Sequence, residues 1–160
     1  MDIAFRVDAS AHIGAGHVMR CLNLARALRD KGASSCFFCR PHEGNLISLV
    51  EQNAFPVVAL PAPATDRGPG AYKDWVGASP EQDARDSLDA LGERKPDWLV
   101  ADHYGLDAQW ERSMRPHVGR IMLIDDLADR LHECDLLLDQ NLHAEGARRY
   151  AGLVSICAAS

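Results

Sequence analysis

Short apolar runs alternate with helical patterns along most of the 160-residue sequence, and this alternation strongly constrains its fold. Six runs are typical of strands: Ile3 to Val7, Ser35 to Cys39, Pro56 to Leu60, Trp98 to Ala101, Ile121 to Ile124 and Leu136 to Leu138. Continuous apolar runs such as IMLI and LLL indicate strands that are buried on both faces. The sequence therefore predicts an α/β fold, a Rossmann-like parallel sheet with helices on both faces, in one domain spanning residues 1–160.

The first predicted strand leads through a glycine-rich turn directly into a helix. Gly14 and Gly16 lack a Cβ, so the backbone can adopt positive φ and approach a ligand closely. Unpaired N–H groups in the first turn of the helix attract anions, phosphates above all. His17 stands at this join, where a neutral imidazole can accept a proton. The pattern favours hydrolysis or transfer at a phosphorylated substrate, although a polar residue without chemistry fits the same position.

Composition narrows the possible partners. The formal net charge is −6 and no run is rich in lysine or arginine, which argues against nucleic acid and anionic membranes as partners. The first residues carry charges within their apolar run, unlike a signal peptide, and no segment is long enough to span a bilayer. The five cysteines are an odd number within apolar stretches, which is typical of reduced thiols. We therefore expect a cytoplasmic protein that binds neither nucleic acid nor membrane.

Motifs for common cofactors are weak or missing. Cys36 and Cys39 form a C-x-x-C, but residues three apart in a strand face opposite sides. Met19 stands where the third glycine of a dinucleotide fingerprint belongs, and the second strand ends in Arg40 instead of an acid. Neither a phosphate-binding G-x-x-x-x-G-K-[ST] loop nor a G-x-S-x-G nucleophile turn occurs. The sequence thus predicts no cofactor and no metal.

Polar residues follow several of the predicted strands. They are Asp8 to His17, Asp102 to Tyr104, Asp125 with Asp126, and Asp139 to Asn141. Ligands of open parallel sheets bind beyond the carboxyl ends of the strands, so we expect the functional site at this edge. Magnesium held by Asp102, Asp125, Asp126 or Asp139 is an alternative, but these acids are far apart in sequence and helix capping accounts for several of them.

The segment Pro61 to Ser79 is rich in proline and glycine and has no periodicity. A loop of this length in a compact domain is usually functional or disordered. Tyr72 and Trp75 within it are placed to close over a ligand, or are simply two packed aromatic residues in a mobile excursion.

Five stretches, in the same order, resemble one known family. They are Arg6 to Ser10, Ile13 to Leu22, Trp98 to Tyr104, Ile124 to Arg130 and Asp135 to Asn141. Together they resemble the nucleotide-sugar hydrolases of pseudaminic acid biosynthesis, which release UDP from UDP-2,4-diacetamido-2,4,6-trideoxy-β-L-altropyranose. The resemblance extends over nearly the whole chain, and several ordered motifs are far more specific than one glycine turn.

The resemblance implies the N-terminal half of a glycosyltransferase-B-like fold. It implies that His17 activates water for attack at the anomeric carbon, that UDP leaves, and that the sugar lies by Tyr104. The further substrate-binding residues predicted on this basis are Arg6, Asp8, Ser10, Gly14 and Gly16. Among these, the side chains of Asp8 and Ser10 are suited to hydrogen-bond hydroxyl and acetamido groups.

The family's C-terminal UDP-binding domain has no counterpart in these 160 residues. The predicted partners are therefore a UDP-sugar and a C-terminal domain or partner chain. Two other functions stay open: the acceptor-side domain of a glycosyltransferase-B-type transferase, and a non-catalytic module that binds a nucleotide sugar or a partner. An acceptor other than water would identify the first, and binding without turnover would identify the second.

Overall fold

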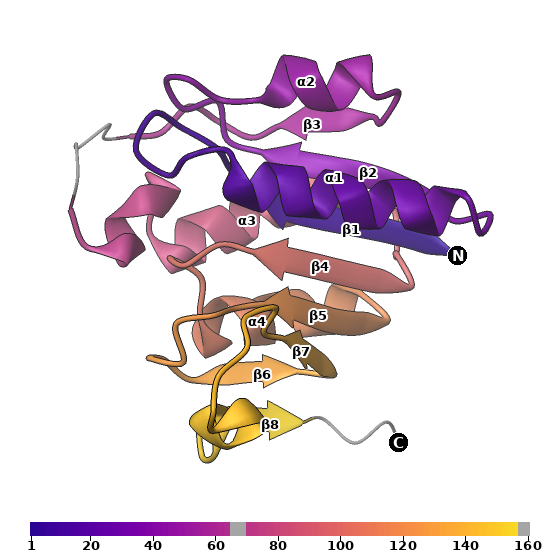
Figure 1. The fold of residues 1–160 in the computed structure, drawn as a ribbon. Coiled ribbons are helices and arrows are strands. Elements are labelled where there is room, and N and C mark those ends of the chain that lie inside the picture. The colour runs from indigo at the N-terminus through magenta and orange to yellow at the C-terminus, as the bar shows by residue number, and fades with distance from the viewer. Residues whose placement is uncertain (65–69, 157–160) are drawn as a thin grey trace.

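The computed structural model describes residues 1–64 and 70–156. Its centre is a six-stranded sheet in the order β3-β2-β1-β4-β5-β7, with every pair of neighbours parallel (Figure 1). The strands are β1 (Asp2–Val7), β2 (Ser34–Cys39), β3 (Val57–Ala59), β4 (Trp98–Asp102), β5 (Arg120–Ile124) and β7 (Leu136–Leu138). Beside it, β6 (His132–Cys134) pairs in parallel with β8 (Val154–Ile156).

Helices cover both faces of the sheet. The α-helices are α1 (Gly16–Arg29), α2 (Ile47–Gln52), α3 (Pro80–Leu91) and α4 (Ala108–Met114). The 3₁₀ helices are η1 (Tyr72–Val76), η2 (Arg115–His117) and η3 (Gly146–Tyr150). On one face of the sheet, alternate side chains of β1, including Phe5, pack against α1 and α2. On the other face, Ala4 of β1 belongs to a second core with α3 and α4. The predicted fold class, a Rossmann-like parallel sheet with helices on both faces, is therefore confirmed.

Local sequence signals fix where α3 and α4 begin. The Ser79 hydroxyl accepts a hydrogen bond from the backbone N–H of Gln82 at 3.2 Å, and Pro80 occupies the first helical position. The Asp107 carboxylate caps α4 by accepting from the N–H of Gln109 at 2.9 Å. Both starts agree with the sequence pattern. Helix α3 ends at Leu91, directly before Gly92.

Among the described residues, Cys21, Cys36 and Cys39 form no disulfide and are buried, and Cys134 is buried as well. Cys36 belongs to the core beneath α3 and α4, and Cys39 to the core beneath α1 and α2, so the two face opposite sides of the sheet as predicted. Cys157 lies outside the described residues. In residues 1–64 and 70–156, no helix has the length and apolar character needed to cross a membrane.

The strand β7 is not buried on both faces, which corrects the expectation drawn from its LLL run. Leu136 is 48% exposed and Leu138 is 41% exposed. The reason is position: β7 is the edge strand of the sheet and pairs only with β5. The continuous apolar run therefore predicts the strand correctly, but it does not show that both faces of the strand are buried.

Candidate active site

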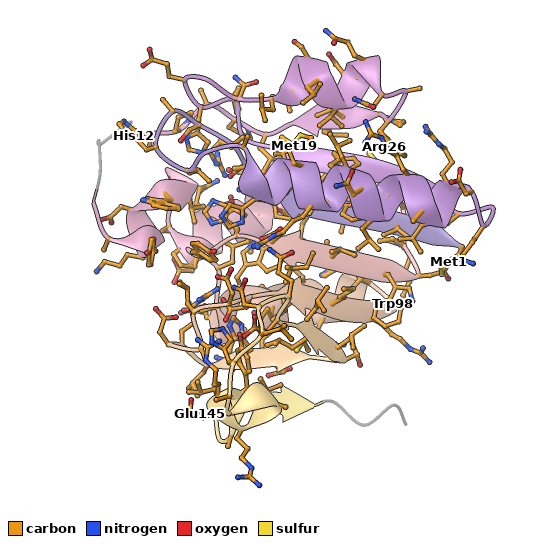
Figure 2. The ribbon with its side chains drawn as sticks, viewed as in Figure 1. Met1, His12, Met19, Arg26, Trp98 and Glu145 are labelled. Carbon is orange, nitrogen blue, oxygen red and sulfur yellow. The ribbon has the colours of Figure 1, made fainter. Side chains whose placement is uncertain are left out.

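The turn before α1 lies at the end of the sheet to which the strand arrowheads point (Figure 1). The Ser10 hydroxyl accepts hydrogen bonds from the N–H groups of His12 at 3.1 Å and Ile13 at 2.9 Å. The Gly14 N–H donates to the Ser10 carbonyl at 2.9 Å, and Gly14 has φ +79°, a conformation that favours glycine. Figure 2 shows His12 on this turn, at the end of the molecule opposite Met1.

The space in front of the turn is open. A Cβ added at Gly14 or at Gly16 would have no neighbour within 4 Å. The backbone at these two positions is therefore accessible to a ligand. The 14-residue helix α1 begins at Gly16, so its N-terminus faces the same space.

His17 projects from the first turn of α1 toward the end of β4. Its Nδ1 lies 2.6 Å from Oδ1 of Asp102, and the imidazole side chain is only 7% exposed. Because an ionised carboxylate can only accept, Nδ1 carries the hydrogen of this bond. Among residues 1–64 and 70–156, Nε2 has no hydrogen-bond partner. A neutral ring held in this way presents Nε2 as a proton acceptor.

Asp102 is fully buried at the end of β4 and is also bound by Arg20. Nε of Arg20 donates to Oδ2 at 2.5 Å and its NH2 group donates to Oδ1 at 2.5 Å. Burial raises the pKa of Asp102, but the hydrogen bonds from Arg20 and His17 outweigh it and hold the pKa below its ordinary value. Asp102 is therefore an anion at neutral pH.

The pairing of His17 with Asp102 was not predicted from the sequence. The sequence marks Asp102 only as a polar residue at a strand end or as a candidate magnesium ligand. The sequence holds one signal for an acidic partner: Arg20 lies three residues after His17, so the two basic side chains share one face of α1.

Tyr104 lies directly against His17, with ring centroids 4.5 Å apart in an edge-on arrangement. Its hydroxyl donates to Oδ1 of Asp126 at 2.6 Å. Partial burial, together with the Asp126 carboxylate, raises the pKa of Tyr104 to about 12, so the phenol stays protonated. Asp126 also accepts from Nδ2 of Asn141 at 3.1 Å, which brings the end of β7 to the same site.

Two aromatic residues of the long loop join this cluster. The ring centroids of Tyr72 and Trp75 lie 5.2 Å and 6.0 Å from that of Tyr104. They belong to η1, a short helix that the sequence analysis did not predict because five residues are too few for a periodic signal. Tyr72 is 44% exposed, so the cluster presents an aromatic surface beside His17. The loop residues 65–69 lie outside the described part of the chain.

Gly105 allows η1 to pack this closely. A Cβ at Gly105 would lie 2.5 Å from Cγ2 of Val76 and 2.9 Å from the carbonyl oxygen of Tyr72. We expect Gly105→Ala to displace η1 and to lower the free energy of unfolding by about 1–3 kcal/mol. Urea unfolding with near-ultraviolet circular dichroism of the aromatic cluster measures both effects. Gly16→Ala, where the added Cβ meets no neighbour, is the stability control; equal stability of the two variants would contradict this packing role.

Arg6 and Asp8 lie beneath the site and are fully buried. NH1 of Arg6 donates to Oδ1 of Asp8 at 2.6 Å, and the same oxygen accepts from the N–H of Arg40 at 2.7 Å. Burial raises the pKa of Asp8, but the charge of Arg6 holds it well below its ordinary value. The structure thus brings Ser10, the two glycines of the turn, His17 and Tyr104 to one open edge, with Arg6 and Asp8 supporting that edge from below.

No metal cluster is formed by the histidine, cysteine and acidic residues in the described part of the chain. The strand-end aspartates have protein partners instead. Asp125 binds NH2 of Arg130 at 2.7 Å, and Asp139 binds NH1 of Arg149 at 2.6 Å. The chemistry that this arrangement offers is proton transfer by a histidine held by a carboxylate.

The fold and the site define a class: an α/β domain whose parallel sheet carries a histidine–carboxylate pair at its carboxyl edge. Comparison with known proteins is more specific. Over 154 residues the chain is 30% identical to the UDP-2,4-diacetamido-2,4,6-trideoxy-β-L-altropyranose hydrolase of Campylobacter jejuni, covering 96% of this chain and 46% of that protein. The family resemblance carried by the sequence motifs is confirmed by this match.

Other comparisons are more distant. An uncharacterized protein of Methanocaldococcus jannaschii is 25% identical over 126 residues, covering 79% of this chain and 22% of that protein. The chain thus spans less than half the length of the curated relatives it matches. No protein-family model matches it. The solved calicheamicin glycosyltransferase CalG4 is similar with a TM-score of 0.48 and 19% identity, covering 78% of this chain and 32% of that one.

Proposed function

We propose that this chain is the sugar-side half of a hydrolase in pseudaminic acid biosynthesis. The reaction converts a UDP-linked 2,4-diacetamido-2,4,6-trideoxyhexose into UDP and the free sugar. The observation that carries the proposal is the 2.6 Å contact between Nδ1 of His17 and Asp102, which leaves Nε2 as the proton acceptor beside an open glycine turn. Similarity to the Campylobacter hydrolase supports the substrate class.

In the proposed reaction, Nε2 of His17 takes a proton from water as the water oxygen attacks the anomeric carbon. The bond between that carbon and the β-phosphate oxygen breaks, and its electron pair leaves with UDP. The imidazolium that forms is stabilised by the Asp102 carboxylate. Binding energy from the nucleotide, supplied by the other half of the cleft, positions the reacting carbon.

We assign the sugar to the edge formed by the turn and Tyr104. Ser10 and the backbone of Gly14 and Gly16 offer hydrogen bonds to hydroxyl, acetamido or phosphate groups, and Tyr104 borders the base. For Arg6 and Asp8, burial favours a supporting role beneath the turn; direct contact with substrate, as the sequence analysis expects, requires the turn to move. Cys21, Cys36 and Cys39, which are buried and form no disulfide among the described residues, fit a cytoplasmic location.

A glycosyltransferase is the second candidate. The surface formed by Tyr72, Trp75 and Tyr104 beside His17 is suited to stack an acceptor sugar, whose hydroxyl would replace water as the nucleophile. The same base would serve both reactions, so the acceptor alone separates them.

The test measures UDP release from the diacetamido-trideoxy-altrose nucleotide. This 160-residue chain is assayed alone and then mixed with the separately produced C-terminal half of the Campylobacter relative. Release of UDP together with free sugar in the mixture supports the hydrolase. Release only after an alcohol acceptor is added identifies the transferase. Binding of the nucleotide sugar by the folded mixture without any release contradicts both enzymes and identifies a binding module.

A further inference from the structure

His103 lies between Asp102 and Tyr104 in the sequence, and the proposed reaction gives it no role. Its side chain is 1% exposed, at the point where β4 ends and the turn that carries Tyr104 begins. Nδ1 of His103 accepts a hydrogen bond from the backbone N–H of Gly105 at 3.0 Å. This contact spans two residues, as in the turns that asparagine and aspartate side chains form with the backbone. The imidazole therefore closes the turn on which Tyr104 stands.

The hydrogen bond from Gly105 fixes the state of the imidazole. A ring nitrogen that accepts from an N–H carries no hydrogen, so the hydrogen of the neutral ring is on Nε2. Burial lowers the pKa of His103 and outweighs the nearby Asp8 carboxylate, which raises that pKa. The ring is therefore neutral at neutral pH, and its Nε2–H is available as a donor.

The acceptor that faces this N–H is the carboxylate of Asp8, directly after β1. Oδ2 of Asp8 lies 3.4 Å from Nε2 of His103, and Nε2 of His42 lies 3.6 Å from the same oxygen. Oδ1 of Asp8 is already held by NH1 of Arg6 and the backbone N–H of Arg40. Within the described residues, neither Oδ2 of Asp8 nor Nε2 of His103 makes a hydrogen bond to any other group. Because buried polar groups are costly to leave unpaired, their mutual attraction holds the imidazole to the end of β1.

The space around Gly105 is filled by His103 and by η1. A Cβ at Gly105 would lie 3.3 Å from Cε1 of His103 and 2.9 Å from the carbonyl oxygen of Tyr72. The neighbouring ring of Tyr104 has its centroid 4.5 Å from that of His17 and 5.2 Å from that of Tyr72. A shift of this turn would therefore move Tyr104 relative to both rings.

We propose that His103 is a positioning residue for Tyr104. It ties the turn after β4 to the Asp8 carboxylate at the end of β1, and so fixes the place of the Tyr104 ring against His17. The inference rests on the proposed placement of the sugar by Tyr104. It also gives a physical role to Arg6 and Asp8, which the family resemblance assigns to substrate binding and which the structure buries completely. They anchor the imidazole that supports Tyr104.

The experiment is NMR of the 160-residue chain at neutral pH, with nitrogen-15 in the histidine rings. In the native chain the hydrogen of His103 is expected on Nε2, and a nuclear Overhauser effect is expected between the rings of His17 and Tyr104. His103→Phe keeps an aromatic ring without either polar contact, and is expected to lose that effect. His103→Asn keeps an acceptor for the N–H of Gly105 and is expected to retain it. His117→Phe, at an exposed position of η2, is the matched control.

The turnover assay separates positioning from a general loss of stability. In the mixture with the C-terminal half of the Campylobacter relative, His103→Phe is expected to lower kcat/KM for the nucleotide sugar about 10- to 100-fold, because a small displacement at the reacting centre has effects of this size. The affinity for UDP should stay unchanged, since the proposed reaction assigns UDP to the other half of the cleft. Unfolding would lower both quantities together. His103→Asn is expected to keep kcat/KM within a few fold of the native value.

Three results would overturn the inference: hydrogen on Nδ1 of His103 in the native chain, an unchanged contact between His17 and Tyr104 in a folded His103→Phe variant, or kcat/KM of that variant within a few fold of the native value. If His103→Phe does not fold, the native chain and His103→Asn decide. Loss of the ring contact in a folded His103→Asn variant would show that the volume of the imidazole holds the turn, and not its bond to Gly105. Displacement of Tyr104 in His103→Phe, together with no turnover by the native mixture, would contradict the hydrolase and leave the positioning role standing.

Discussion

Replacing His17 by asparagine is expected to reduce UDP release about 10²- to 10⁴-fold in the mixture of this chain with the C-terminal half of the Campylobacter relative. In the proposed reaction the imidazole removes the proton of water in the transition state, and asparagine fills a similar volume without a basic nitrogen. The affinity for UDP should stay unchanged, because the proposed reaction assigns the nucleotide to the other half of the cleft. Initial rates and equilibrium binding of UDP separate the two quantities.

His12→Asn is the matched control for this prediction. His12 lies on the same turn but is exposed, and its backbone N–H, not its ring, takes part in the turn. We expect near-native rates for it. Turnover of His17→Asn within a few fold of the native rate would exclude His17 as the base and direct attention to another proton acceptor.

The sequence predicted most of the fold because periodic elements carry a repeated signal. Strands such as β1 and β4 and the long helices α1 and α3 repeat apolar residues often enough to be recognised, and Ser79 and Asp107 mark helix starts directly. The short strands β6 and β8 and the helix η1 were missed, since the two three-residue strands are interrupted by Glu133 and Ser155 and η1 is too short for a helical pattern to repeat. Edge position, which exposes Leu136, depends on strand order and not on local sequence.

The site was predictable only in part, for a related reason. A glycine turn running into a helix with His17 at the join is local, and the sequence contained it. The partner of that histidine is Asp102, 85 residues away, brought close only because β1 and β4 are neighbours in the sheet. The packing of Tyr72 on Tyr104 likewise depends on where the loop returns. Pairings of this kind follow from topology and cannot be read from spacing.

A buried ionic network beneath the site carries the largest expected effect on stability. Asp83 of α3 accepts from Nε of Arg6 at 3.0 Å and from NH2 of Arg6 at 2.6 Å. It also accepts from NH2 of Arg40 at 2.8 Å and from Nε1 of Trp110 at 3.0 Å. One fully buried carboxylate therefore joins β1, the residue after β2, α3 and α4.

Asp83→Ala is expected to lower the free energy of unfolding by about 3–5 kcal/mol, because it leaves the buried guanidinium groups of Arg6 and Arg40 without their shared partner. That loss is large against the roughly 5–15 kcal/mol typical of a whole domain. Urea unfolding at neutral pH measures it. Asp89→Ala, at an exposed position of the same helix, should change stability by less than about 0.5 kcal/mol. Similar free energies of unfolding for the two variants would show that the network does not contribute to stability.

The pH dependence of this difference provides an independent check. Burial raises the pKa of Asp83, but the charge and hydrogen bonds of Arg6 and the bond from Arg40 bring it below its ordinary value of 3.8. A carboxylate whose pKa is lowered by folding stabilises the protein above the unfolded pKa and loses that contribution as the pH falls through the folded pKa. The stability difference between the native chain and Asp83→Ala should therefore be constant above about pH 5 and shrink below about pH 4. A difference that grows on acidification would mean that Asp83 is protonated in the folded state, and the network would then have to be held by Asp8 and Asp86 instead.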